Sequence, residues 1–332
     1  MTAIKKIFQL GNQWPTQDPF LFCAFHHDHF PKGNGKMGPK ASLEGRNIGQ
    51  DFANKDGWNM YHGQTVPGFP HHPHRGFETV TIVEKGIADH FDSLGAKGRF
   101  GEGDVQWMTA GKGVQHSEMF PLLKTEEENE LLLFQIWLNL PAKDKMVDAH
   151  YKMLWNEDIP TLTLENGISI KLIAGAYDDQ KALAPTPNSW AANTENTVAI
   201  WIGTIDANAE WSVPTAESVI NRSIYFFQGD EIQVEGYEIP TLHGMYVSPE
   251  KELTIKNGNK QAKFLLIQGK PIGEPVAQQG PFVMNTYQEI TDAIMEYRKT
   301  EFGGWPWNSH DPTNEDKKGR FALHADGKEE VR

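Results

Sequence analysis

Two short motifs place histidines and a carboxylate at the spacing of strand residues that share one face. One residue separates His72 from His74, and one residue separates His116 from Glu118. Alternate side chains of a β-strand point to the same side, roughly 6.5 to 7 Å apart. Each pair can therefore converge on one ion above its strand, and two such pairs on neighbouring strands would supply four ligands.

Three imidazoles and one carboxylate suit a divalent transition metal such as Fe(II), Mn, Ni, Cu or Zn. Four protein ligands leave coordination positions open, which is typical of a reactive rather than a structural site. A single His-x-His pair is weak evidence, because surface and packing histidines are common. The joint pattern is more specific: HPHRGFET is followed by GDVQWMTAGKGVQHSE, and nine of the 13 histidines fall between His26 and His116.

The elements that must position these residues are short β-strands separated by glycine turns. In the first half, such runs are ETVTIVE at 78–84, VQWMT at 105–109 and LLLFQIWLNL at 131–140. A second series follows at 197–205, 223–228, 231–236, 251–255 and 263–269. Strands at this spacing predict antiparallel sandwiches or barrels.

Two segments have helical character. The stretch at 288–299 places Ile290, Ile294 and Tyr297 at helical spacing, which predicts a helix near the C-terminus. The stretch KDKMVDAHYKML predicts a helical turn after the first strand series.

Composition narrows the function classes. A length of 332 residues suits two domains, and a net charge of -13 argues against the broad basic surface that nonspecific DNA binding requires. The single cysteine, Cys23, builds neither an intramolecular disulfide nor a cysteine metal site. No apolar run is long enough for a signal peptide or a membrane span. We therefore expect a cytoplasmic protein with no membrane partner and no direct nucleic-acid partner.

The chain resembles the pirin family, whose members are bicupins of the cupin superfamily. The resemblance rests on GFPHHPHRGFETVTIVEKG at 68–86, GDVQWMTAGKGVQHSEM at 103–119 and GEPVAQQGPFVMNT at 273–286. It covers roughly residues 20 to 300, and FGGWPW at 302–307 with the tail beyond resembles longer bacterial pirin-like proteins. The implied fold is all-β, with two consecutive cupin-type antiparallel β-barrels, a short C-terminal helix and a tail.

The resemblance also implies how the chain is divided. We expect an N-terminal barrel with the metal site at 1–145 and a linker region at 146–195. A C-terminal barrel without a metal site is expected at 196–287, followed by the helix and tail at 288–332.

By resemblance, the metal ligands are His72, His74, His116 and Glu118. Many other cupins use a glutamate at the place of Glu78, which lies an even number of residues from His74. Strand alternation by itself therefore leaves both glutamates open. The resemblance implies one divalent metal ion, with Fe(II) as the expected ion and Mn, Ni, Cu or Zn as the alternatives.

Family members are associated with quercetin 2,3-dioxygenase activity. The resemblance therefore implies an oxidoreductase that cleaves a small aromatic, flavonol-like substrate with O2. Glu118 is the candidate catalytic base for the flavonol hydroxyl proton. The alternative is a metal-responsive regulatory bicupin that binds a protein partner without significant turnover, because the human family member is described as a transcriptional co-regulator. Another cupin-type reaction, such as an isomerisation, is a third hypothesis.

Four other histidines in the first half are expected to lie outside the site. His71 alternates with His72, so it should point to the opposite face of the strand. His26, His27 and His29 could suggest a second metal site. Their loop-like surroundings and the lack of a partner cluster instead favour a solvated loop.

Overall fold

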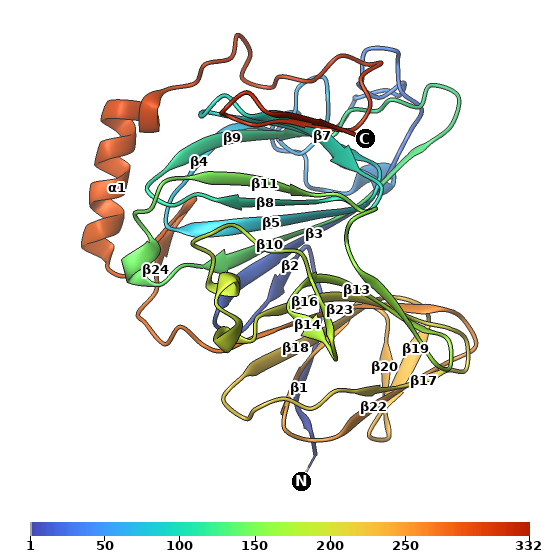
Figure 1. The fold of residues 1–332 in the computed structure, drawn as a ribbon. Coiled ribbons are helices and arrows are strands. Elements are labelled where there is room, and N and C mark those ends of the chain that lie inside the picture. Colours follow the sequence, from blue (N-terminus) through green and yellow to red (C-terminus); the bar gives the residue numbers. More distant parts are fainter. Residues whose placement is uncertain (1) are drawn as a thin grey trace. The chain divides into compact units, whose positions relative to one another are not determined.

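Regular structure in this computed structural model, which describes residues 2–332, is almost entirely β-strand (Figure 1). Among these residues there is one α-helix, α1 (Tyr287–Thr300), close to the expected helix at 288–299. The prediction of an all-β fold with a short C-terminal helix is confirmed. None of the helices in this part of the chain combines the length and the apolar character needed to cross a bilayer.

Two compact units make up the chain, and neither is contiguous in sequence. Unit 1 comprises the chain up to Ala24, Trp137–Asn139 and Glu157–Gly273. Unit 2 comprises Phe25–Ile136, Leu140–Asn156 and Glu274–Arg332.

The predicted domains were contiguous, so the units differ from the predicted boundaries at both ends of the chain. The reason is strand pairing over long sequence distances. Strand β1 (Ile4–Gln9) pairs with β21 (His243–Val247), which ties the N-terminal strand to unit 1. Strand β26 (Phe321–Leu323) pairs with β7 (Lys97–Gly101), which ties the tail to unit 2.

Unit 1 is built on a seven-stranded sheet, in the order β1-β21-β18-β23-β16-β13-β12, and a four-stranded sheet, in the order β17-β22-β19-β20. In β17 of the four-stranded sheet alternate residues are buried, and Trp211 and Val213 point into the core, whereas β16 of the seven-stranded sheet is buried at almost every residue. The further strands of these sheets are β12 (Thr161–Leu164), β13 (Ile168–Ala174), β16 (Ala199–Ile205), β17 (Glu210–Val213), β18 (Asn221–Gln228), β19 (Glu231–Val234), β20 (Tyr237–Pro240), β22 (Leu253–Asn257) and β23 (Ala262–Gly269).

Unit 2 holds the sequence motifs. One of its sheets has the order β27-β26-β7-β6-β9-β4. The other has the order β11-β8-β5-β10-β3-β2, of which β2, the start of β3 and the end of β10 are counted in unit 1. Their further strands are β2 (Gln13–Pro15), β3 (Phe20–Phe30), β4 (Gly68–His74), β5 (Phe77–Lys85), β6 (Ile87–Asp92), β8 (Val105–Thr109), β9 (Val114–Met119), β10 (Asn129–Asn139), β11 (His150–Leu154) and β27 (Glu329–Val331).

The remaining elements are short. Two small hairpins pair β14 (Ala176–Tyr177) with β15 (Gln180–Lys181), and β24 (Ala277–Gln279) with β25 (Phe282–Met284). The 3-10 helices are η1 (Lys55–Gly57), η2 (Ala142–Asp144), η3 (Trp190–Ala192), η4 (Thr194–Asn196) and η5 (Glu301–Gly303).

The expected linker region at 146–195 contains regular structure. It holds β11, β12 and β13. The stretch 143–154, where a helical turn was predicted, begins in the 3-10 helix η2 and ends as β11, which pairs with β8. Apolar residues of this stretch are recruited into sheets, so pairing with distant strands overrides the weak helical pattern.

Helix α1 begins at a capping box. The Thr286 side chain accepts from the Glu289 backbone N–H, and the Glu289 carboxylate accepts from the Thr286 backbone N–H. These two hydrogen bonds give acceptors to backbone N–H groups at the start of the helix that have no partner within it. The helix packs Ile290 and Ala293 against Phe282 and Met284 of the β24–β25 hairpin.

Candidate metal centre

The two predicted motifs lie on neighbouring strands. Strand β4 pairs antiparallel with β9 so that His72 is directly opposite His116. The register shifts between Phe69 and His72, and this irregularity sets the position of the HPH segment relative to β9. On its other side β9 pairs with β6, where His90 is opposite Glu118.

The three predicted histidine ligands converge. Ring centroids are 4.5 Å apart for His72 and His116, 4.7 Å for His72 and His74, and 4.8 Å for His74 and His116. One ligand nitrogen from each ring lies within 4.8 Å of the others. His74 and His116 are buried and His72 is half-buried, so the cluster opens to one side.

Glu118 lies next to this trio. Its Oε2 is 3.7 Å from His116 Nε2, and the residue is buried. Thr81 donates to Oε1 at 3.2 Å and Gln135 donates to Oε2 at 2.7 Å. Both carboxylate oxygens are therefore oriented by neutral donors from β5 and β10, and one edge of the carboxylate faces the imidazoles.

Glu78 faces the other way. It accepts hydrogen bonds from Trp107 Nε1 at 3.2 Å and from Thr109 Oγ1 at 2.7 Å. Thr81, three residues along β5, reaches Glu118, and an odd step on a strand places side chains on opposite faces. The even spacing from His74 carries no information, because β4 ends at His74 and β5 begins only at Phe77.

Burial keeps the imidazoles neutral. Desolvation lowers the pKa of His72 to about 4 and moves the pKa values of His74 and His116 well below their usual range, and the neighbouring rings lower both further. His72 Nδ1 lies 2.9 Å from the Pro70 carbonyl oxygen, which can only accept, so Nδ1 carries the proton. The Nε2 lone pair of His72 is then available to a metal ion.

The residues present fit a metal ion. Both ring nitrogens of His116 are buried without a hydrogen-bond partner among the described residues. A buried polar group of this kind is destabilising unless something pairs with it. A divalent cation among three neutral imidazoles and a carboxylate would supply that partner.

Burial also raises the pKa of Glu118. This effect is larger than the lowering of that pKa by the electrostatic interaction with His90 and by the hydrogen bonds from Gln135 and Thr81. Sequence reasoning did not single out His90, Thr81 or Gln135. His90 is buried and its ring stacks on Tyr151 at 4.9 Å. A sequence signal existed for Gln135, which is a polar residue inside the apolar run LLLFQIWL of β10.

His71 lies away from the cluster, as its alternation with His72 predicted. Its Nδ1 is 3.0 Å from His310 Nδ1, and its ring stacks on Trp305 at 4.9 Å. The corner after β4 is held separately, because buried Arg75 pairs with Glu296 of α1 at 2.9 Å.

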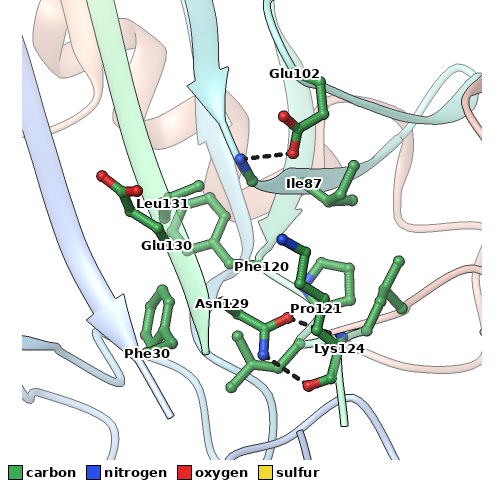
Figure 2. A pocket seen from close by; sticks show the side chains of 12 residues that line it. Phe30, Ile87, Glu102, Phe120, Pro121, Lys124, Asn129, Glu130 and Leu131 are labelled. Atoms are coloured by element: carbon green, nitrogen blue, oxygen red, sulfur yellow. Dashed lines mark hydrogen bonds between the residues drawn. The ribbon is translucent and has the colours of Figure 1, made fainter. Parts of the chain in front are cut away.

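A cavity of about 240 Å³ lies at one end of the strands of unit 2 (Figure 2). Its lining is mainly apolar and includes Phe30, Phe120 and Leu131. None of the four predicted metal ligands lines it.

The chain is similar to known proteins of one family. The family described as Pirin matches residues 10–138, and the family described as Pirin C-terminal cupin domain matches residues 200–303. A protein of Pseudomonas aeruginosa with the provisional name quercetin 2,3-dioxygenase is 38% identical over 236 residues, which is 70% of this chain and 79% of that protein. Human Pirin is 34% identical over 255 residues, covering 74% of this chain and 81% of its own length.

Among solved structures, a quercetin 2,3-dioxygenase from Acinetobacter baumannii is similar to the chain with a TM-score of 0.71 and 27% identity. The similarity covers 92% of this chain and 99% of that one. The chain matches both family models, and it is more than 30% identical to relatives over about four-fifths of their length. This chain therefore belongs to the pirin family of bicupins.

Proposed function

We propose that the chain is a metal-dependent dioxygenase that cleaves quercetin-like flavonols with O2, with His72, His74, His116 and Glu118 as metal ligands. The observation that carries the proposal is the buried cluster of three neutral imidazoles beside an oriented carboxylate. The similarity to proteins named as quercetin 2,3-dioxygenases supports the choice of reaction. Fe(II) is our expected ion, with Mn, Ni, Cu and Zn as alternatives.

A bound divalent ion would supply Lewis-acid chemistry to a substrate with adjacent hydroxyl and carbonyl oxygens. The chain would supply position and a place for the proton. The raised pKa of Glu118 suits it to accept the flavonol hydroxyl proton. Thr81 and Gln135 would keep its carboxylate aimed at the imidazoles during that transfer.

The test is oxygen uptake by the fully metal-loaded chain across a panel of flavonols. Glu118→Gln retains the size of the side chain but removes the base, so we expect it to lose most of the rate. Glu78→Gln is the matched control, because Glu78 is equally buried but lies on the other face of β5. Its kcat should be affected much less once the variant is shown to fold.

Flat oxygen traces with every flavonol, in a chain that binds its metal normally, would refute the dioxygenase proposal. That result would favour the metal-responsive, partner-binding alternative. Full metal content in His74→Ala would instead refute the ligand assignment, and loss of metal with full activity retained would refute the metal dependence.

A further inference from the structure

A second group of metal-ligating side chains lies outside the buried cluster. His27 and His29 are on β3, and Glu130 is on β10, in the same sheet. One ligand atom from each lies within 4.8 Å of the others, and the two imidazole rings are 4.7 Å apart. The expected solvated loop is therefore a strand, and the partner that the sequence lacked comes from a strand about 100 residues later.

Strand alternation explains why these residues share one face. Asp28 and Phe30 are buried. His27, which precedes Asp28, and His29, which lies between the two, therefore point to the exposed face of the strand. Glu130 is an odd step from Gln135, which donates to Glu118. The group is thus on the opposite face of the sheet from the buried cluster.

The Glu130 carboxylate contacts both the His27 imidazole and the Lys85 ammonium group. Glu130 Oε1 is 3.1 Å from His27 Nε2, and Glu130 Oε2 is 2.8 Å from Lys85 Nζ. Although burial raises the pKa of Glu130, the hydrogen bonds and charges of Lys85 and His27 outweigh it and leave that pKa lowered. The carboxylate is therefore ionised at neutral pH.

The surroundings favour a cation. A polar hollow of about 540 Å³ adjoins the group and is lined by four carboxylates and two ammonium groups, those of Glu102, Glu127, Glu128, Glu130, Lys85 and Lys124. Negative side chains therefore outnumber positive ones two to one. Figure 2 shows Glu130 on β10 with its carboxylate turned away from Pro121 of the apolar cavity.

We infer that His27, His29 and Glu130 form a second, exposed binding site for a divalent transition-metal ion. Two imidazoles and a carboxylate are ligands that Zn, Ni and Cu accept, and water can complete the coordination sphere at an exposed site. The Lys85 ammonium group already pairs with the Glu130 carboxylate, so the ion must displace it to bind there. Its side chain is 44% exposed, so it can move into solvent.

Nickel titration of the chelator-stripped, full-length chain by calorimetry tests the inference. Wild type should bind one more equivalent of Ni²⁺ than the double variant His27→Gln with His29→Gln. His150→Gln, which changes an exposed strand histidine, is the control and should keep the wild-type stoichiometry. The comparison holds whether or not the buried cluster takes nickel, because all these chains share that cluster.

A second variant separates a metal site from an ordinary surface ion pair. Lys85→Met removes the competing ammonium and should tighten Ni²⁺ binding at this site by about two- to fivefold, the value of an exposed ion pair. Equal stoichiometry in wild type and the double variant would overturn the inference. Weaker nickel binding in Lys85→Met would overturn it as well.

Discussion

His116→Leu should stabilise the metal-free chain while abolishing metal binding at the buried cluster. In the structure, both ring nitrogens of His116 are buried and lack a hydrogen-bond partner among the described residues. An unsatisfied buried polar group costs about 1–3 kcal/mol, and leucine fills a similar volume without that cost. We therefore expect the free energy of unfolding of the metal-free variant to exceed that of wild type by about 1–3 kcal/mol.

Metal should reverse the order. A ligand at 1,000 times its Kd stabilises the folded state by about 4.1 kcal/mol, and only wild type can gain this at the buried cluster, since both chains keep His27, His29 and Glu130. Urea denaturation with a chelator and with excess metal measures both differences. His26→Leu is a matched control, because His26 Nδ1 has a partner, the Tyr61 hydroxyl, at 2.9 Å. This control should lose about 0.5–1.5 kcal/mol without metal and should bind metal normally.

A metal-free His116→Leu chain that is less stable than wild type by 1 kcal/mol or more, on the same order as a lost hydrogen bond, would refute the reasoning. It would mean that the His116 ring is satisfied without metal, and that its burial is structural rather than a preparation for a ligand.

Three further outcomes are expected. Arg99→Ala should lower the free energy of unfolding by about 3–5 kcal/mol in urea denaturation, because it leaves the buried carboxylate of Asp89, which Arg99 Nε contacts at 2.7 Å, without its counter-charge. The metal-free chain should lose stability as pH falls from about 6.5 to about 4, because burial lowers the pKa of His72 in the folded state and the unfolded state therefore takes up the proton first. The difference between the free energies of unfolding at pH 7 and at pH 5 should be smaller for His72→Gln than for wild type. Gly76→Ala should lower the melting temperature and weaken metal binding in calorimetry, because Gly76 has a φ of +86° and an added Cβ would lie 2.0 Å from the Val283 carbonyl oxygen. An unchanged melting temperature and an unchanged affinity for metal would contradict this packing between Gly76 and Val283.

Much of the buried cluster could be predicted from the sequence. The two-residue spacings of His72 with His74 and of His116 with Glu118 indicate strands that present paired ligands, and alternation correctly placed His71 on the other side. The strands of the second half and helix α1 followed from local patterns of apolar residues and turns. Local patterns suffice here because strand and helix periodicity is a property of neighbouring residues.

Other features required the tertiary structure. Even spacing from His74 could not decide between Glu78 and Glu118 as the ligand, because the chain turns between β4 and β5 and the alternation of faces starts again there. Only the hydrogen bond from Thr81 to Glu118 and the one from Trp107 to Glu78 show which way each glutamate faces. The interleaved units arise from pairing of the terminal strands with distant partners.

The His27 and His29 pair shows the same limit most directly. The sequence contains both histidines at strand spacing, yet the third member, Glu130, and the competing Lys85 come from other strands. Spacing along a strand determines which side chains share a face, whereas the strand that lies beside them depends on the register of the whole sheet. The amino-acid sequence therefore indicated that histidines of this chain would bind metal, and the packing of the sheets decided which carboxylate stands next to each group.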